Sequence, residues 1–472
     1  MLEPNVLRLA AGSAVAGLAL AATAAGLAGP WDGGQRTAER HRAAAPAETG
    51  GAHHGHGAVP GAPAVLPAAP APAPSAPAVL TPLAAPLTAQ GTPAPALAEA
   101  LDPLLRAPGL GGPRTASVVD VASGRQLYGH GAAMPMTPAS TVKIATTAAA
   151  LSALGPDHRL ATTVVATPDA KALTLVGGGD PTLDRARLKA LAADTAKALR
   201  ARSAAPTALT YDAGLYDGPV RHRIGVNDNI APVTPLMTRA GRLDRSTHGP
   251  APRAQDPARE TARAFAELLA AQGVKLPTDP VPGRAPQQRL PLAVTHSAPL
   301  SDLVERTLTY SDNDLAEALA RATARATGHP ASFDGAGAAV RAQLRKLGVP
   351  LDGAALRDGS GLDRRARVSA RLLTAVLARA ADPAHPELRP VLTGLPVGGF
   401  SGTLENRYTG GSPAAGLVRA KTGTLTGVNA LSGTVVTRDG RLLAFAFLAS
   451  DTPSPYEAQP ALDALATALT TR

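Results

Sequence analysis

The stretch "MTPASTVKIAT" at residues 136–146 places Ser140 three residues before Lys143. It opens a predicted helix from about residue 140 to residue 154, which Gly155 and Pro156 end. Three residues make nearly one helical turn, so both side chains share a face of the helix. A serine at a helix start is usually an N-cap. With an amine one turn away, it is also a candidate nucleophile beside a base.

Most of the 46 basic residues of the chain are arginines, so a lysine at position 143 suggests a specific chemical role. A lysine can accept the proton of a serine hydroxyl once burial or nearby positive charge lowers its pKa. Arginine cannot, because it does not lose its proton in proteins. Ser140 and Lys143 are therefore candidates for a nucleophile and its base, although the motif alone is weak evidence.

A second motif, Ser311-Asp312-Asn313 in "LTYSDNDLAE", lies between two predicted helices. Serine, aspartate and asparagine are common in loops and helix caps, so the motif alone is weak. In the functional interpretation, Ser311 passes a proton to a leaving amine and Asn313 holds a substrate carbonyl.

A third motif, Lys421-Thr422-Gly423, lies on a predicted strand in "GLVRAKTGTLTG". It could be an exposed strand lysine beside a flexible glycine. In the functional interpretation, Lys421 and Thr422 bind a carboxylate, and Gly423 lets a ligand backbone approach the strand. The backbone N–H of Thr424 then pairs with that of Ser140 as an oxyanion hole.

The three motifs, in this order, resemble those of the penicillin-recognising serine enzymes. Further stretches resemble the class C low-molecular-mass penicillin-binding proteins. These are "LVGGGDPTL" at 175–183, "RDGSGLDRRARVS" at 357–369 and "LPVGGFSGTL" at 395–404. The resemblance covers residues 97–472.

The resemblance implies an α+β fold, in which a transpeptidase-like domain combines an antiparallel sheet with helices. In that family an extra domain is inserted between the first and second motifs. Residues 97–162 and 288–472 are thus expected to form the peptidase domain. Residues 163–287 are expected to form the strand-rich insertion, with one clear helix near residues 256–273.

The implied function is that of a serine D-alanyl-D-alanine carboxypeptidase or endopeptidase. It acts on peptidoglycan stem peptides through an acyl-enzyme, is inhibited by β-lactams and needs no metal or cofactor. One alternative is a serine β-lactamase, but no glutamate begins the E-x-x-L-N motif of the class A enzymes. Another is a wall-binding protein or β-lactam sensor without turnover. A purely structural surface protein leaves the coincidence of three motifs unexplained.

The N-terminus predicts export. Residues 9–29 form an apolar run that fits a signal peptide or a membrane anchor within residues 1–30. Residues 31–96 form an alanine- and proline-rich linker, in which His53, His54 and His56 are interpreted as a polar patch rather than a metal site. Membrane contact is expected only through the N-terminal segment. We expect an extracytoplasmic protein of the cell wall.

Composition excludes other classes. The chain has no cysteine, which rules out disulfides and thiolate sites. Its net charge is +10, but the arginines are scattered and aromatic residues are only 3% of the chain, which argues against nucleic-acid binding.

Overall fold

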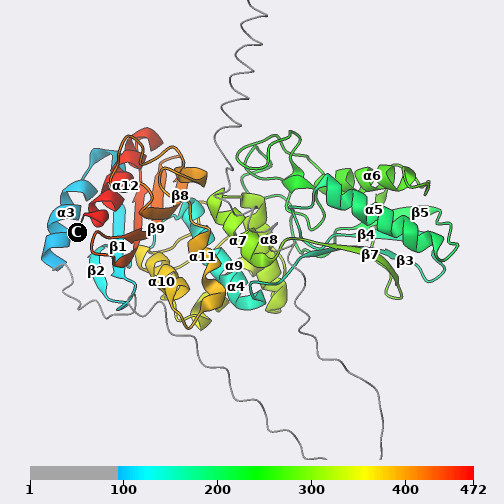
Figure 1. The fold of residues 1–472 in the computed structure, drawn as a ribbon, viewed down its shortest axis with the longest axis horizontal. Coiled ribbons are helices and arrows are strands. Elements are labelled where there is room, and N and C mark those ends of the chain that lie inside the picture. Colours follow the sequence, from blue (N-terminus) through cyan, green and yellow to red (C-terminus); the bar gives the residue numbers. More distant parts are fainter. Residues whose placement is uncertain (1–93, 472) are drawn as a thin grey trace, which may run out of the picture. The chain divides into compact units, whose positions relative to one another are not determined.

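The computed structural model describes residues 94–471 (Figure 1), and these residues belong to one compact unit. The predicted N-terminal segment and the three linker histidines lie outside the described residues. No helix among residues 94–471 combines the length and apolar character needed to cross a bilayer.

The first sheet has five antiparallel strands in the order β2-β1-β10-β9-β8. Its strands are β1 (Arg114–Asp120), β2 (Gln126–His130), β8 (Val418–Leu425), β9 (Val428–Val436) and β10 (Leu442–Ser450). The two N-terminal strands therefore join three strands from the far end of the chain. Asp439 and Gly440 lie in the β9–β10 connection, as the sequence predicts.

Both faces of this sheet are buried. Along β10, Phe445 and Phe447 pack with helices α3 (Ala94–Leu105) and α12 (Pro455–Thr470). The alternate residues Ala444 and Ala446 point to the other face, toward α10 (Ala370–Ala381) and α4 (Val142–Leu154). The period of two along the strand produces this alternation. The expected α+β fold is confirmed.

Helix α4 is the centre of the helical layer. It packs against α7 (Leu300–Thr309), α8 (Asn313–Ala326), α9 (Phe333–Lys346) and α10, with the short α11 (Pro390–Thr393) nearby. All ten residues from Val142 to Leu151 are buried. A helix that is buried on every side belongs in a core, and its many alanines let neighbouring helices approach. Lys143 is thus carried into the interior by the helix that holds it.

The second sheet has the order β6-β5-β4-β3-β7. Its strands are β3 (Ala161–Ala166), β4 (Ala172–Val176), β5 (Ala208–Asp212), β6 (Val281–Pro282) and β7 (Leu290–His296). Because β7 pairs with β3, this sheet uses residues on both sides of the predicted 163–287 segment. We call residues 161–296 the inserted region.

The inserted region contains two helices, α5 (Arg185–Arg200) and α6 (Pro257–Ala270), so the expectation of one clear helix was wrong. Helix α5 buries Leu188, Leu191 and Leu199 against the sheet. The charged residues of α5 lower its mean hydropathy, so these leucines do not stand out in the sequence as the apolar face of a helix. Asp184 caps its N-terminus by accepting the N–H of Arg187.

Candidate active site

Ser140 lies on a single 3₁₀ turn, Ala139–Thr141, immediately before α4. The α-helix begins at Val142, so Ser140 lies just before it, whereas the sequence predicts that Ser140 opens the helix. Ala139 adopts a left-handed conformation with φ 46°. This turn exposes part of Ser140, whereas Lys143 is fully buried one turn later.

Lys143 joins the first two motifs. Its Nζ donates to Ser140 Oγ at 3.0 Å and to Asn313 Oδ1 at 2.7 Å. A third hydrogen bond runs to the backbone carbonyl of Ser360 at 2.6 Å. The amine is thus held within reach of the hydroxyl proton that a base must remove.

The second motif lies between α7 and α8. Ser311 has φ 56°, and Asp312 caps α8 by accepting the N–H of Leu315 at 3.0 Å. Asn313 begins the helix and donates through Nδ2 to the backbone carbonyl of Asn229 at 2.9 Å. The amide predicted to hold a substrate carbonyl is therefore itself oriented by Lys143 and by the inserted region.

The third motif lies on β8, the edge strand of the first sheet. Lys421 is fully buried and donates to the carbonyl of Thr422 at 2.9 Å. The hydroxyl of Thr422 donates to Thr403 Oγ1 at 3.0 Å. Among the described residues no carboxylate forms an ion pair with Lys421, so an anion entering from outside could supply the missing counter-charge.

Gly423 has a neighbour that the sequence does not predict. A Cβ at this position would lie 2.8 Å from the carbonyl oxygen of Pro138 and 3.3 Å from the Cβ of Ala139. The glycine therefore lets β8 pack against the turn that carries Ser140.

The motifs share one cavity of about 270 Å³. Of the predicted residues, those lining it are Ser140, Ser311, Asn313, Thr422 and Thr424. A larger cavity of about 890 Å³ lies beside β1 and α10 and contains no motif residue, so its size does not make it the site.

The inserted region supplies one wall of the motif cavity, which sequence reasoning missed. Asn229, Arg242, His248 and Arg253 all line it. The His248 ring stacks on Tyr310, with centroids 4.2 Å apart. No motif or spacing in the sequence points to these residues, because they lie on loops that reach the site only through the fold.

A buried ion pair fixes this wall to α8. Arg253 Nη1 lies 2.7 Å from Asp314 Oδ2, and both side chains are almost fully buried. The other oxygen of Asp314 accepts the N–H of Ala231 at 2.9 Å. The residue that follows Asn313 is therefore held by two segments of the inserted region.

The two lysines of the site are electrostatically coupled. Burial lowers the pKa of Lys143 to about 8, although the carboxylates of Asp358 and Glu317 oppose the shift. Burial also lowers the pKa of Lys421 well below its ordinary value, and the charge of Lys143 adds to this effect. A neutral Lys143 is the form that can accept a proton.

Acylation of Ser140 is expected to accelerate as pH rises through about 8. Lys143 carries a proton below its pKa and is free to accept one above it. The fall of the acylation rate at low pH is therefore assigned to Lys143. The measurement is the second-order rate constant for acylation by benzylpenicillin between about pH 6 and about pH 10. A rate that stays flat across this range contradicts the assignment of Lys143 as base.

Asp312→Asn is expected to change the acylation rate less than about threefold, because asparagine caps helices as well as aspartate does. Ser311→Ala and Asn313→Ala are each expected to slow it by about a hundredfold, since the first removes the predicted proton relay and the second removes the amide that accepts a hydrogen bond from Lys143. Stopped-flow acylation of the three variants tests this ranking. Equal losses in all three would refute the different roles.

The serine-lysine pair, the polar turn between two helices and the edge strand of an antiparallel sheet define the penicillin-recognising class of serine enzymes. The chain belongs to the D-Ala-D-Ala carboxypeptidase 3 (S13) family, whose model matches residues 97–252 and 237–469. The predictions of a class C low-molecular-mass penicillin-binding protein and of a serine-type D-Ala-D-Ala carboxypeptidase are thereby confirmed.

Curated relatives and solved structures agree. The chain is 40% identical to carboxypeptidase DacB of Mycolicibacterium smegmatis over 391 residues, which cover 79% of this chain and 83% of the relative. It is 31% identical over 460 residues to a D-alanyl-D-alanine carboxypeptidase of Actinomadura sp., covering 79% and 85%. Penicillin binding protein 4 of Haemophilus influenzae has the same fold, with TM-score 0.63, 22% identity and coverage of 77% and 94%.

Proposed function

We propose that the enzyme hydrolyses the bond between the two terminal D-alanine residues of peptidoglycan stem peptides, with Ser140 as nucleophile. The observation that carries the assignment is the 3.0 Å hydrogen bond between Lys143 Nζ and Ser140 Oγ, at a lysine whose pKa burial lowers to about 8. Lys143 takes the hydroxyl proton, and Ser140 Oγ bonds to the peptide carbonyl carbon. The oxyanion lies between the backbone N–H groups of Ser140 and Thr424.

Collapse of this intermediate breaks the C–N bond and leaves an ester on Ser140. Ser311 relays a proton to the departing amine of D-alanine, and Asn313 positions the peptide. Lys421 and Thr422 bind the terminal carboxylate, whose negative charge favours the protonated form of Lys421, a buried lysine with no paired carboxylate among the described residues. Water then cleaves the ester and regenerates the serine.

The test is release of D-alanine from a stem pentapeptide by the purified protein, with Ser140→Ala as the inactive control. A cross-linked muropeptide as second substrate separates endopeptidase from carboxypeptidase action. Acylation by benzylpenicillin without D-alanine release would instead identify a sensor. Rapid turnover of the penicillin would identify a β-lactamase.

β-Lactams are proposed as inhibitors, because a strained cyclic amide presents its carbonyl to Ser140 as the peptide does. The ring opens when Oγ attacks, and the leaving amine stays tethered to the acyl group. Deacylation is then expected to be slow, since no glutamate in an E-x-x-L-N motif is available as a second base.

Export is proposed from the apolar run at residues 9–29, which follows Arg8 and contains Ala22-Thr23-Ala24, a typical cleavage motif. N-terminal sequencing of the protein from culture and membrane fractions tests this. A mature chain beginning after Ala24 identifies a signal peptide, and an intact membrane-bound chain identifies an anchor. An intact chain confined to the cytoplasm contradicts the proposal.

A further inference from the structure

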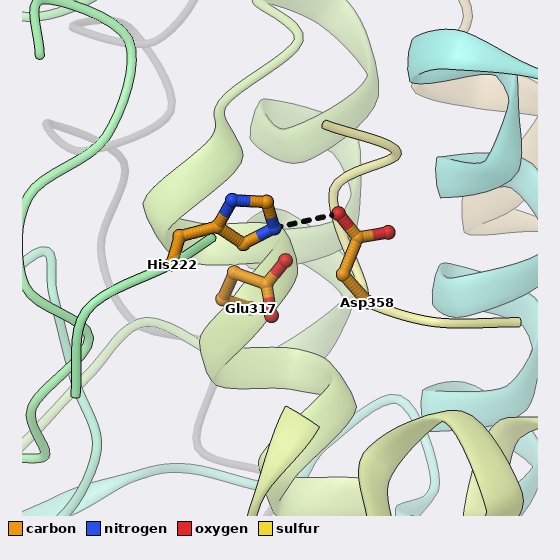
Figure 2. Close-up of side chains that lie close together, drawn as sticks. All are labelled: His222, Glu317 and Asp358. Carbon is orange, nitrogen blue, oxygen red and sulfur yellow. Dashed lines mark hydrogen bonds and ion pairs between the residues drawn. The ribbon is translucent and has the colours of Figure 1, made fainter. Parts of the chain in front are cut away.

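His222 belongs to the inserted region and makes a buried contact with the peptidase part of the chain. Its Nε2 lies 3.0 Å from Asp358 Oδ2, and only 4% of the residue is exposed (Figure 2). Its Nδ1 accepts the N–H of Ile224 at 3.3 Å, which leaves Nε2 as the donor to Asp358. His222 lies outside the three catalytic motifs and does not line their cavity.

Asp358 organises a tight turn over residues 358–363. One carboxylate oxygen accepts the N–H of Gly361 at 3.0 Å. The other accepts the N–H of Asp363 at 2.8 Å, the Ser360 hydroxyl at 3.2 Å and the contact from His222. Among the described residues, His222 is therefore the one hydrogen-bond partner of this carboxylate that lies outside the 358–363 turn.

This turn touches both members of the serine-lysine pair. The carbonyl of Ser360 accepts the 2.6 Å hydrogen bond from Lys143 Nζ. A Cβ on Gly361 would lie 2.0 Å from the carbonyl oxygen of Ala139, the residue before Ser140. A shift of the turn by even a fraction of an ångström therefore moves the partner of the base or presses on the turn that carries the nucleophile.

A metal site is the competing interpretation, because ligand atoms of His222, Glu317 and Asp358 lie within 4.8 Å of one another. The carboxylate of Glu317 is already engaged, however. One oxygen accepts the N–H groups of Gly359 and Ser360, and the other accepts from Arg321 at 2.9 Å. A cation would have to displace hydrogen bonds that hold the turn, so we favour a hydrogen-bonded positioning role.

We propose that His222 is a positioning residue for acylation: through Asp358 it fixes the 358–363 turn, and thereby the amine of Lys143 against Ser140. The inserted region thus supports the chemistry as well as forming a wall of the cavity. This inference rests on the proposed role of Lys143 as base.

The test compares His222→Leu, which removes the donor, with His222→Gln, whose amide can still donate to Asp358. For His222→Leu the first-order acylation rate constant with benzylpenicillin should fall about a hundredfold, while the dissociation constant of the non-covalent complex changes less than about threefold. His222→Gln should recover the rate to within about tenfold of wild type, because the hydrogen bond returns.

His385→Leu is the matched control, since His385 forms a 3.0 Å contact with Glu387 and does not line the cavity. It should acylate as wild type does. A wild-type acylation rate in His222→Leu overturns the inference. So does an acylation rate in His222→Gln that falls as far as that of His222→Leu. Equal loss of binding and acylation indicates a merely structural role and also overturns it. If wild type itself fails to acylate, the proposed function fails instead.

Discussion

Lys143→Arg is expected to reduce acylation of Ser140 by at least about a thousandfold, although it preserves the positive charge. Lys143 lies fully buried with its amine 3.0 Å from Ser140 Oγ, and its lowered pKa allows a neutral form near physiological pH. A guanidinium keeps its proton and cannot accept another. Intact-protein mass spectrometry after exposure to benzylpenicillin measures the loss as the missing adduct of one drug mass.

Lys346→Arg is the matched control, because Lys346 is an exposed lysine in the last turn of α9. The control should carry the adduct on the peptide that contains Ser140, as wild type should. Thermal unfolding of both variants separates a chemical effect from a folding defect. A normally acylated, folded Lys143→Arg enzyme would mean that another group is the base.

Gly361→Ala is expected to lower the free energy of unfolding by about 3 kcal/mol and to slow acylation by about a hundredfold. Gly361 has φ 83°, and a Cβ there would collide with the carbonyl oxygen of Ala139 at 2.0 Å. Relief of that clash requires either the 358–363 turn or the Ser140 turn to move. Chemical denaturation and stopped-flow acylation measure the two effects.

Gly440→Ala isolates the cost of the backbone conformation alone. Gly440 has nearly the same φ, 81°, but a Cβ there meets nothing within 4 Å. The free energy of unfolding of this variant should fall by about 1 kcal/mol, and its acylation rate should equal that of wild type. If the two variants lose equal stability and both acylate normally, the close approach of Gly361 to the Ser140 turn does not matter for the site.

The motif residues could be predicted because each belongs to a short local pattern. Ser140 and Lys143 are one helical turn apart, so their proximity follows from local geometry before any tertiary structure is known. The β9–β10 hairpin was also readable, since Asp439 and Gly440 interrupt two apolar runs.

The remaining parts of the site depend on contacts between distant segments. Asn229 reaches Asn313 through a backbone carbonyl, which carries no side-chain signature at all. The backbone carbonyl of Ser360 likewise accepts a hydrogen bond from Lys143, which lies 217 positions earlier in the sequence. Gly423 is predicted to leave space for a ligand backbone, whereas a Cβ at this position would meet the carbonyl oxygen of Pro138 and the Cβ atoms of Ala430 and Ala139. Such roles follow from packing and not from residue type.

The ion pair between Arg253 and Asp314 limits how this enzyme could be shortened. A shortened chain that lacks Arg253 but still covers α8 would leave the carboxylate of Asp314 in the interior without its guanidinium. Losing one partner of such a pair typically costs about 3–5 kcal/mol. A smaller descendant, natural or engineered, would first have to replace the acid at position 314 with an uncharged residue.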